Sequence, residues 1–155
     1  MGPELEKAIH ELSLRMRLIR AMQEGDAPET ISEREALILQ QLYERKSMTI
    51  SEIADSWPNV SESTISMTIT KLWRTKKYVS KTIKPENQRV TIVELTDRGK
   101  EAIEMYLKQR SERFNALFHA IHVTPEEKEV LMRVCQKGIQ FLDKYLGSRN
   151  TNPDN

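Results

Sequence analysis

Residues 61–95 read SESTISMTITKLWRTKKYVSKTIKPENQRVTIVEL, and the pattern of this stretch changes at its middle. The first part places Ile65, Ile69 and Leu72 at helical spacing among hydroxyl side chains. The second part alternates like a β-strand on both sides of the segment KPENQ. The stretch therefore predicts a helix followed by a hairpin, with strands at about 78–84 and 89–95 and PENQ at the exposed tip.

Positive charge is concentrated in the same stretch. It contains seven basic and three acidic side chains, a net charge of +4, whereas the rest of the chain carries −3. A solvated surface of lysine and arginine is the plain interpretation of such a run. Because the charge lies on one helix and one hairpin, we favour an anionic partner.

Length and composition restrict the class of protein. A chain of 155 residues, with 30% charged and 38% hydrophobic residues, suits one compact soluble domain with extensions. No apolar run approaches the ~20 residues that cross a bilayer, and the N-terminus lacks the apolar core of a secretory signal. We therefore expect a cytoplasmic protein with no membrane partner. The single cysteine, Cys135, excludes an intrachain disulfide framework and a multi-thiolate metal site.

Capping residues mark the helix starts on both sides of the stretch. A Ser or Thr stands before a helical pattern at five places, Ser32, Thr49, Ser61, Thr96 and Thr124. Three of them have Glu three residues further on, which is the capping-box pattern. The predicted order is four helices, the hairpin and two more helices. The fold class is thus mainly α with a small β-hairpin.

The short helix that begins at Thr49, the turn WPNV and the helix after Ser61 together predict a helix-turn-helix. Hydroxyl groups at a helix N-terminus suit phosphate oxygens, and Lys71 and Arg74 can reach bases or phosphates. The basic hairpin would act as a wing in the adjacent minor groove. The alternative is that these hydroxyls are ordinary solvent-facing residues. The candidate DNA-contacting residues are Ser61, Ser63, Thr64, Ser66, Met67, Thr68, Thr70, Lys71, Arg74, Lys84, Asn87, Gln88 and Arg89.

At this point the chain resembles the MarR family of winged helix-turn-helix transcription regulators. The resemblance rests on TISEIADSWPNVSESTISMTITKLW followed by KPENQRVTIVELTDRG, and with the flanking helices it covers about residues 5–146. Family members have a Ser-x-Ser-Thr opening on the recognition helix, which Ser61, Ser63 and Thr64 match. They also end the wing with Leu-Thr-x-x-Gly, which here is residues 95–99.

The chain departs from the family pattern at several positions. Asn87 stands where the family often has an Asp that holds the wing arginine, here Arg89. Asn can still accept a hydrogen bond from Arg89, without the assistance of charge. The segment TKKYV contains no Gly to end the recognition helix, and Met67 replaces a frequent Arg. These changes affect which bases are read and the docking angle.

The resemblance implies a homodimeric repressor that binds a palindromic DNA site through interlocked terminal helices and is released by a small apolar or phenolic ligand. The implied regions are residues 1–31 for a dimerisation helix and linker, 32–98 for the DNA-binding domain, 99–146 for further dimerisation helices, and 147–155 for a disordered tail. Candidate ligand-lining residues are Met16, Ile19, Arg20, Met22, Tyr43 and Trp57. The terminal helices support dimerisation, because apolar stripes run along both of them.

Other functions are weighed against this one. A winged helix can serve as a protein–protein adaptor without specific DNA binding, and a metal- or redox-sensing regulator is a further alternative. His119 and His122 lack an identified carboxylate partner for zinc. Cys135 lies on the apolar line of the last helix, so we expect a packed and inert thiol. The chain has no P-loop, G-x-S-x-G or H-E-x-x-H motif, so no enzyme and no cofactor are expected.

Overall fold

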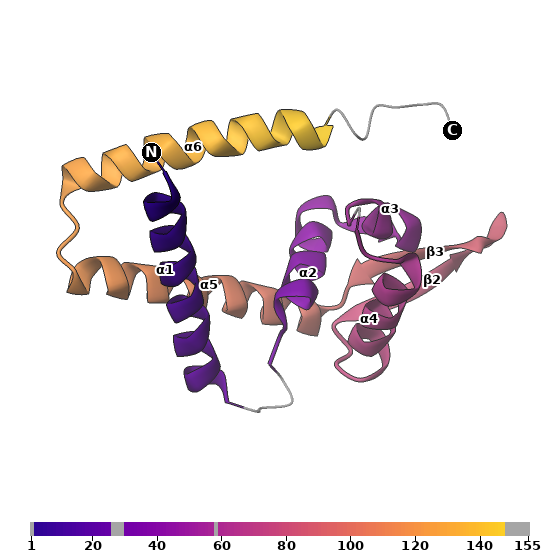
Figure 1. Ribbon diagram of the computed structural model, residues 1–155. Helices are drawn as coiled ribbons and strands as arrows, with labels where there is room; N and C mark the ends of the chain where they lie inside the picture. The colour runs from indigo at the N-terminus through magenta and orange to yellow at the C-terminus, as the bar shows by residue number, and fades with distance from the viewer. Residues whose placement is uncertain (1, 26–29, 58, 148–155) are drawn as a thin grey trace. The chain divides into compact units, whose positions relative to one another are not determined.

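The computed structural model describes residues 2–25, 30–57 and 59–147, and the chain divides into two compact units after Leu107. The elements in chain order are α1 (Pro3–Glu24), α2 (Glu33–Arg45), β1 (Ser47–Thr49), α3 (Ile50–Asp55), α4 (Glu62–Arg74), β2 (Val79–Lys84), β3 (Asn87–Leu95), α5 (Asp97–Ala120) and α6 (Pro125–Gly147) (Figure 1). The prediction of a mainly helical fold with a small β-hairpin is confirmed. The expected disordered tail falls almost wholly outside the described residues.

The helix starts are where the capping residues predicted them. At α2, the Ser32 hydroxyl accepts a bond of 3.2 Å from the backbone N–H of Glu35, and the Glu35 carboxylate accepts one of 2.9 Å from Ser32. The same capping box opens α3 at Thr49 and α6 at Thr124. Each box satisfies N–H groups that have no partner inside the helix, which fixes where the helix begins.

A three-stranded antiparallel sheet joins the hairpin to the helices, with strand order β1-β3-β2. The strand β1 was not predicted, because three residues are too few for an alternating pattern. It pairs Ser47 with Glu94 and Thr49 with Ile92. The hairpin tip is shorter than predicted: β3 already begins at Asn87, which pairs with Lys84 beyond a bulge. The sheet thereby ties the hairpin to the segment between α2 and α3.

The core of the first unit lies between α2, α3, α4 and the sheet. The side chains of Ile65, Ile69 and Leu72 are fully buried, as the helical spacing predicted. The other fully buried side chains are Ile38, Leu39, Leu42, Met48, Ile53, Val79, Val93 and Ile103. They come from every element between α2 and the first turns of α5, so the helices and the hairpin share one core.

The junction between α4, the hairpin and α5 is unusually close. The Thr96 hydroxyl donates to the carbonyl of Lys77 at 2.7 Å and accepts from the N–H of Gly99 at 3.1 Å. A Cβ on Gly99 would overlap the Tyr78 carbonyl group. Lys77 itself has a φ of 58°, so a lysine adopts the left-handed conformation for which Gly would be expected. The Leu-Thr-x-x-Gly segment therefore serves to seat α5 against the chain that leaves α4.

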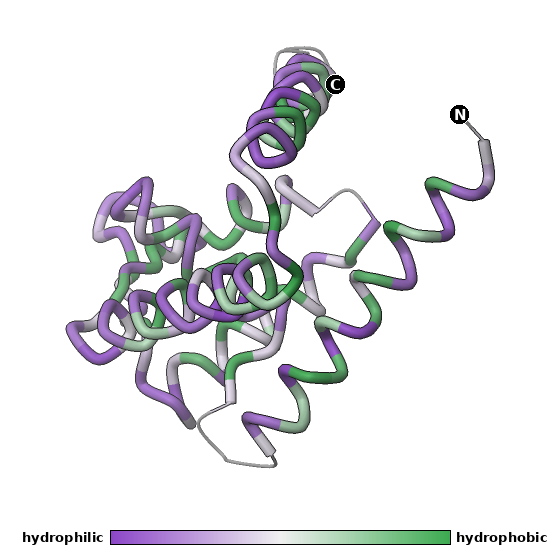
Figure 2. The backbone as a smooth tube through the Cα atoms, turned by 90° about the vertical axis from the view of Figure 1, so that its left-hand side faces the viewer, coloured by the Kyte–Doolittle hydropathy of each residue, from purple (hydrophilic) through white to green (hydrophobic). Residues whose placement is uncertain are grey.

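In the second unit, α6 has no buried residue. The prediction that Cys135 is packed is wrong for this chain, because Cys135 is exposed. Its neighbours on the predicted apolar line are exposed as well, with Val134 at 62% and Leu142 at 55%. The sequence identified an apolar face correctly, but the side chains of that face are exposed. In Figure 2, hydrophobic and hydrophilic residues alternate along both α6 and α1, and α1 also lacks buried residues.

Candidate nucleic-acid interface

The N-terminus of α4 presents a cluster of hydroxyl groups. The Ser61 hydroxyl accepts from the backbone N–H of Thr64 at 3.2 Å and lies 3.1 Å from that of Ser63 and 2.8 Å from that of Thr64. Ser61 and Ser63 are exposed. Helix N-termini carry free N–H groups and a positive partial charge, so this end of α4 suits a phosphate oxygen.

The face of α4 opposite the core is open to solvent. Ser63, Met67, Lys71 and Arg74 are exposed, with Met67 at 73%. The remaining candidates on this helix, Thr64, Ser66, Thr68 and Thr70, are half-buried. The Thr68 hydroxyl donates to the carbonyl of Thr64 at 3.0 Å. The exposed side chains on this face are therefore the two cations, one serine and Met67.

The wing displays its candidate residues at its tip. Lys84, Asn87, Gln88 and Arg89 are all exposed. The side-chain oxygen of Asn87 accepts a bond of 3.1 Å from the backbone N–H of Arg89, not from its guanidinium group. The expected hydrogen bond between these two residues thus forms through the main chain. This bond shapes the turn and does not orient the Arg89 side chain.

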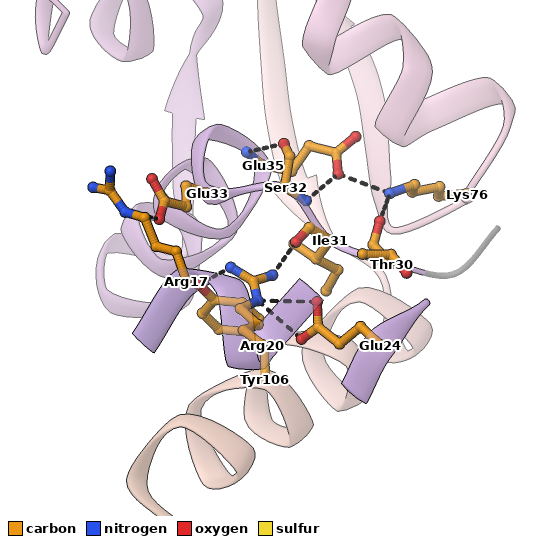
Figure 3. A network of polar contacts seen from close by, with 10 residues as sticks. All are labelled: Arg17, Arg20, Glu24, Thr30, Ile31, Ser32, Glu33, Glu35, Lys76 and Tyr106. Carbon is orange, nitrogen blue, oxygen red and sulfur yellow. Dashed lines mark hydrogen bonds and ion pairs between the residues drawn. The ribbon is translucent and has the colours of Figure 1, made fainter. Parts of the chain in front are cut away.

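A buried acid–base pair lies behind α4, and the sequence did not reveal it. Glu35 and Lys76 are only 2% and 6% exposed, and the Lys76 ammonium lies 2.7 Å from the Glu35 carboxylate and 2.7 Å from the carbonyl of Thr30 (Figure 3). Lys71, from the open face of α4, forms a longer ion pair with Glu35 at 3.4 Å. The capping box predicted a role for Glu35, but its second partner is 41 residues away in sequence.

The charge of Glu35 is set by these neighbours. Burial alone raises the pKa of Glu35, but the hydrogen bonds from Lys76 and from the Ser32 N–H, with the charges of Lys76 and Lys71, outweigh it. The pKa therefore lies below its ordinary value, and Glu35 is ionised at neutral pH. The negative charge anchors Lys76, two residues beyond the end of α4, and so ties the end of α4 to the start of α2.

The candidate ligand-lining residues do not form one group. Arg20 is enclosed: its guanidinium donates to both Glu24 carboxylate oxygens at 2.9 Å, to the Tyr106 hydroxyl at 3.0 Å and to the Ile31 carbonyl (Figure 3). It lines a cavity of about 370 Å³ between the end of α1 and the start of α2. Met16, Ile19 and Met22 lie on α1, where Met22 is 84% exposed.

The other two candidates come from separate elements. Tyr43, on α2, is 40% exposed and donates to Glu104 at 3.0 Å. Trp57, between α3 and α4, packs against the core. Within the described part of the chain, no three His, Cys, Asp or Glu side chains are grouped to hold a metal ion. No helix in the described ranges has the length and apolar character needed to cross a membrane.

Comparisons with known proteins agree with this geometry. Residues 31–99 match the family model described as a winged helix DNA-binding domain. The uncharacterized HTH-type transcriptional regulator YdgJ of Bacillus subtilis is 33% identical over 107 residues, which are 69% of this chain and 63% of that protein. The chain thus spans less than two thirds of the length of that relative.

Solved structures show the same fold at low identity. The crystal structure of MarR superposes with a TM-score of 0.72 at 21% identity, covering 92% of this chain and 99% of that one. The FabT protein of Streptococcus pneumoniae, solved in complex with DNA, gives 0.73 at 17% identity, covering 92% and 97%. The matched domain and the fold place residues 31–99 in the class of winged helix DNA-binding domains. Within that class the fold of the chain is of the MarR type, which confirms the resemblance seen in the sequence.

Proposed function

We propose that the protein is a cytoplasmic homodimer that binds a palindromic site in duplex DNA, represses transcription there and is released by a small apolar or phenolic ligand. The observation that carries the DNA-binding part is the open face of α4 beside the wing. The wing tip, residues 84–89, is exposed, and so are Ser63, Lys71 and Arg74 on α4. The two belong to one domain because α4 and the sheet share one hydrophobic core. A helix and a basic hairpin held in this way suit a major groove and the neighbouring minor groove.

The homodimer is supported by the terminal helices. Leu5, Ile9 and Leu12 on α1 are each more than half exposed, and Phe141 on α6 is 70% exposed. Apolar area of this extent in water favours association, and a second copy offers the same faces. In a two-fold dimer, the two α4 helices would read half-sites about one DNA turn (~34 Å) apart.

Release by a ligand is supported by the cavity beside Arg20. Its volume of about 370 Å³ lies within the range of ~300–1,000 Å³ in which small ligands bind. The cavity is next to Ile31 and Ser32, which lead into α2 and the Glu35–Lys76 pair. A ligand there would act on the segment that positions α4.

The test is selection of binding sites from a random duplex library, followed by titration of the selected site against salt. We expect a palindromic site, and an affinity that falls steeply with rising salt as counterions are displaced from phosphates. Binding only to proteins, or DNA binding without salt dependence, would support the adaptor function instead.

Two variants test the assigned contacts on the selected site. Arg89→Ala should cost about 1–3 kcal/mol on that site if the wing arginine makes a base-edge contact, and much less on random DNA. Lys71→Ala should weaken all sequences alike, since this lysine suits a phosphate. Unchanged affinity of both variants for both DNAs, measured by fluorescence anisotropy, would contradict the contact assignment.

A further inference from the structure

Trp73, near the end of α4, lies beside two cations. Trp73 is 37% exposed, the Arg74 guanidinium lies 5.1 Å from the centre of its ring, and the Lys81 ammonium lies 4.9 Å from that centre. Arg74 comes from α4, whereas Lys81 comes from β2 of the wing. Neither Trp73 nor Lys81 was singled out in the sequence. The ring thus contacts one cation from α4 and one from the wing.

These two cations lack an acidic partner among the described residues. The described ion pairs near α4 are those of Glu35, which take up Lys71 and Lys76. Lys81 instead donates to the hydroxyl of Thr70 at 3.2 Å. Burial, and then the positive charge of the nearby Arg74, lower the pKa of Lys81. Two like charges held together by an aromatic ring, with no carboxylate, form a place where an anion relieves the repulsion.

We propose that Arg74 and Lys81, held by Trp73, form a clamp for one phosphate of the DNA backbone at the junction between α4 and the wing. The proposal rests on the proposed DNA-binding function and adds a contact to it. A guanidinium fork and an ammonium group complement the several oxygens of one phosphate. The contact carries no base preference, so it holds the protein at a fixed height and register on the duplex while other residues read bases.

The clamp is distinct from a stacking platform for single-stranded bases. Such a platform needs an open aromatic face, and here both cations lie over the ring. It is also distinct from the contact expected of Lys71, because the Lys71 ammonium pairs with Glu35 whereas that of Lys81 donates to Thr70.

Counting released counterions tests whether the two cations share one phosphate. The affinities of wild type, Arg74→Gln, Lys81→Gln and the double variant for a random-sequence duplex are measured by anisotropy over a range of salt. Each phosphate contributes about 0.9 to the slope of log affinity against log salt. We expect the double variant to lose about 0.9 in slope. A loss of about 1.8 would mean two separate phosphates, and no loss would mean no contact; either result overturns the clamp.

The role of the ring is tested separately. Trp73→Leu should weaken binding about two- to fivefold, the effect of an exposed cation–π contact, whereas Trp73→Phe should retain most of the affinity. Equal losses in both would contradict a role for the aromatic face. Lys128→Gln removes one charge from an exposed position on α6 and is the matched control, expected to leave the slope unchanged. Circular dichroism verifies folding, and the double variant leaves the ring intact should Trp73→Leu unfold.

The outcomes separate the clamp from the function on which it rests. Wild-type protein that fails to bind the random duplex at low salt would contradict the proposed DNA-binding function itself. Wild-type protein with a steep salt slope that the double variant fully retains would contradict the clamp alone.

Discussion

At the scale of single residues, Gly99 allows the close packing at the junction between α4, the hairpin and α5, because it has no side chain. The position of its Cα leaves no room for a Cβ beside the Tyr78 carbonyl. We expect Gly99→Ala to lower the free energy of unfolding by roughly 1–3 kcal/mol, as overpacking does elsewhere. Gly138→Ala is the control: it lies within α6, where a Cβ meets nothing within 4 Å, and should be neutral or slightly stabilising. Urea unfolding of both variants decides the matter, and equal stabilities would contradict the close approach.

Lys77 is the opposite case, because a residue with a side chain stands where the backbone conformation favours Gly. Its φ of 58° is costly for any residue with a Cβ, by about 1–2 kcal/mol, while Gly adopts it freely but gains entropy when unfolded. We expect Lys77→Gly to raise the stability by up to about 1 kcal/mol. Lys77→Ala removes the same charge but keeps the Cβ, so it should not be stabilising. A gain of equal size in both variants would point to charge and not to backbone conformation.

At the scale of elements, the ion pair of Glu35 and Lys76 joins the start of α2 to the end of α4. Glu35→Gln retains an acceptor for the capping box but leaves the buried Lys76 without its counter-charge, which costs about 3–5 kcal/mol in comparable sites. The matched control is Glu52→Gln in the exposed capping box of α3, which should change stability little. Thermal or urea unfolding of both variants measures the difference.

The same pair predicts how stability depends on pH. The pKa of Glu35 in the folded chain lies below its ordinary value of 4.5, so the folded state favours the ionised form. Its contribution is complete above about pH 4.5 and is lost as pH falls through the lowered pKa. The difference in free energy of unfolding between wild type and Glu35→Gln should therefore shrink as the pH falls. A difference between the two proteins that stays constant from pH 7 to strongly acid pH would contradict this assignment.

Features that depend on residues close together in sequence could be predicted, and features that depend on distant segments could not. The N-caps at Ser32, Thr49 and Thr124 depend on residues three positions apart, and all were predicted correctly. The strand β1 becomes a strand only by pairing with β3, and Lys76 finds Glu35 only after folding. The convergence of Lys81 on Trp73 likewise depends on how β2 packs beside α4. Periodicity identified the buried face of α4 because the core is local to α2, α3 and the sheet.

At the scale of the whole molecule, the prediction for Cys135 failed because an apolar face indicates that something must cover it, without saying what. In the proposed dimer the cover is the second copy, and the thiol becomes a built-in reporter of association. We expect Cys135 to react quickly with a thiol reagent in dilute protein, and progressively more slowly as sedimentation shows dimer forming.

A relocated thiol gives the control for this experiment. In a Cys135→Ser protein that also carries Glu86→Cys, the thiol sits at the exposed wing tip and should react at one rate at every concentration. The contrary result is that the thiol of the wild type reacts as fast in the dimeric protein as in the urea-unfolded chain. That result would exclude the part of α6 around Cys135 from the interface.

The strand β1 determines which part of the wing can change during evolution. Its three pairs with β3, between Ser47–Thr49 and Ile92–Glu94, fix the register of the hairpin at its base, well away from residues 84–89. Because strand register is set at that end, we expect changes in the length or charge of the outer turn to leave the core side chains in place. The length and charge of the wing tip can in this sense vary during evolution while the body of the domain stays the same.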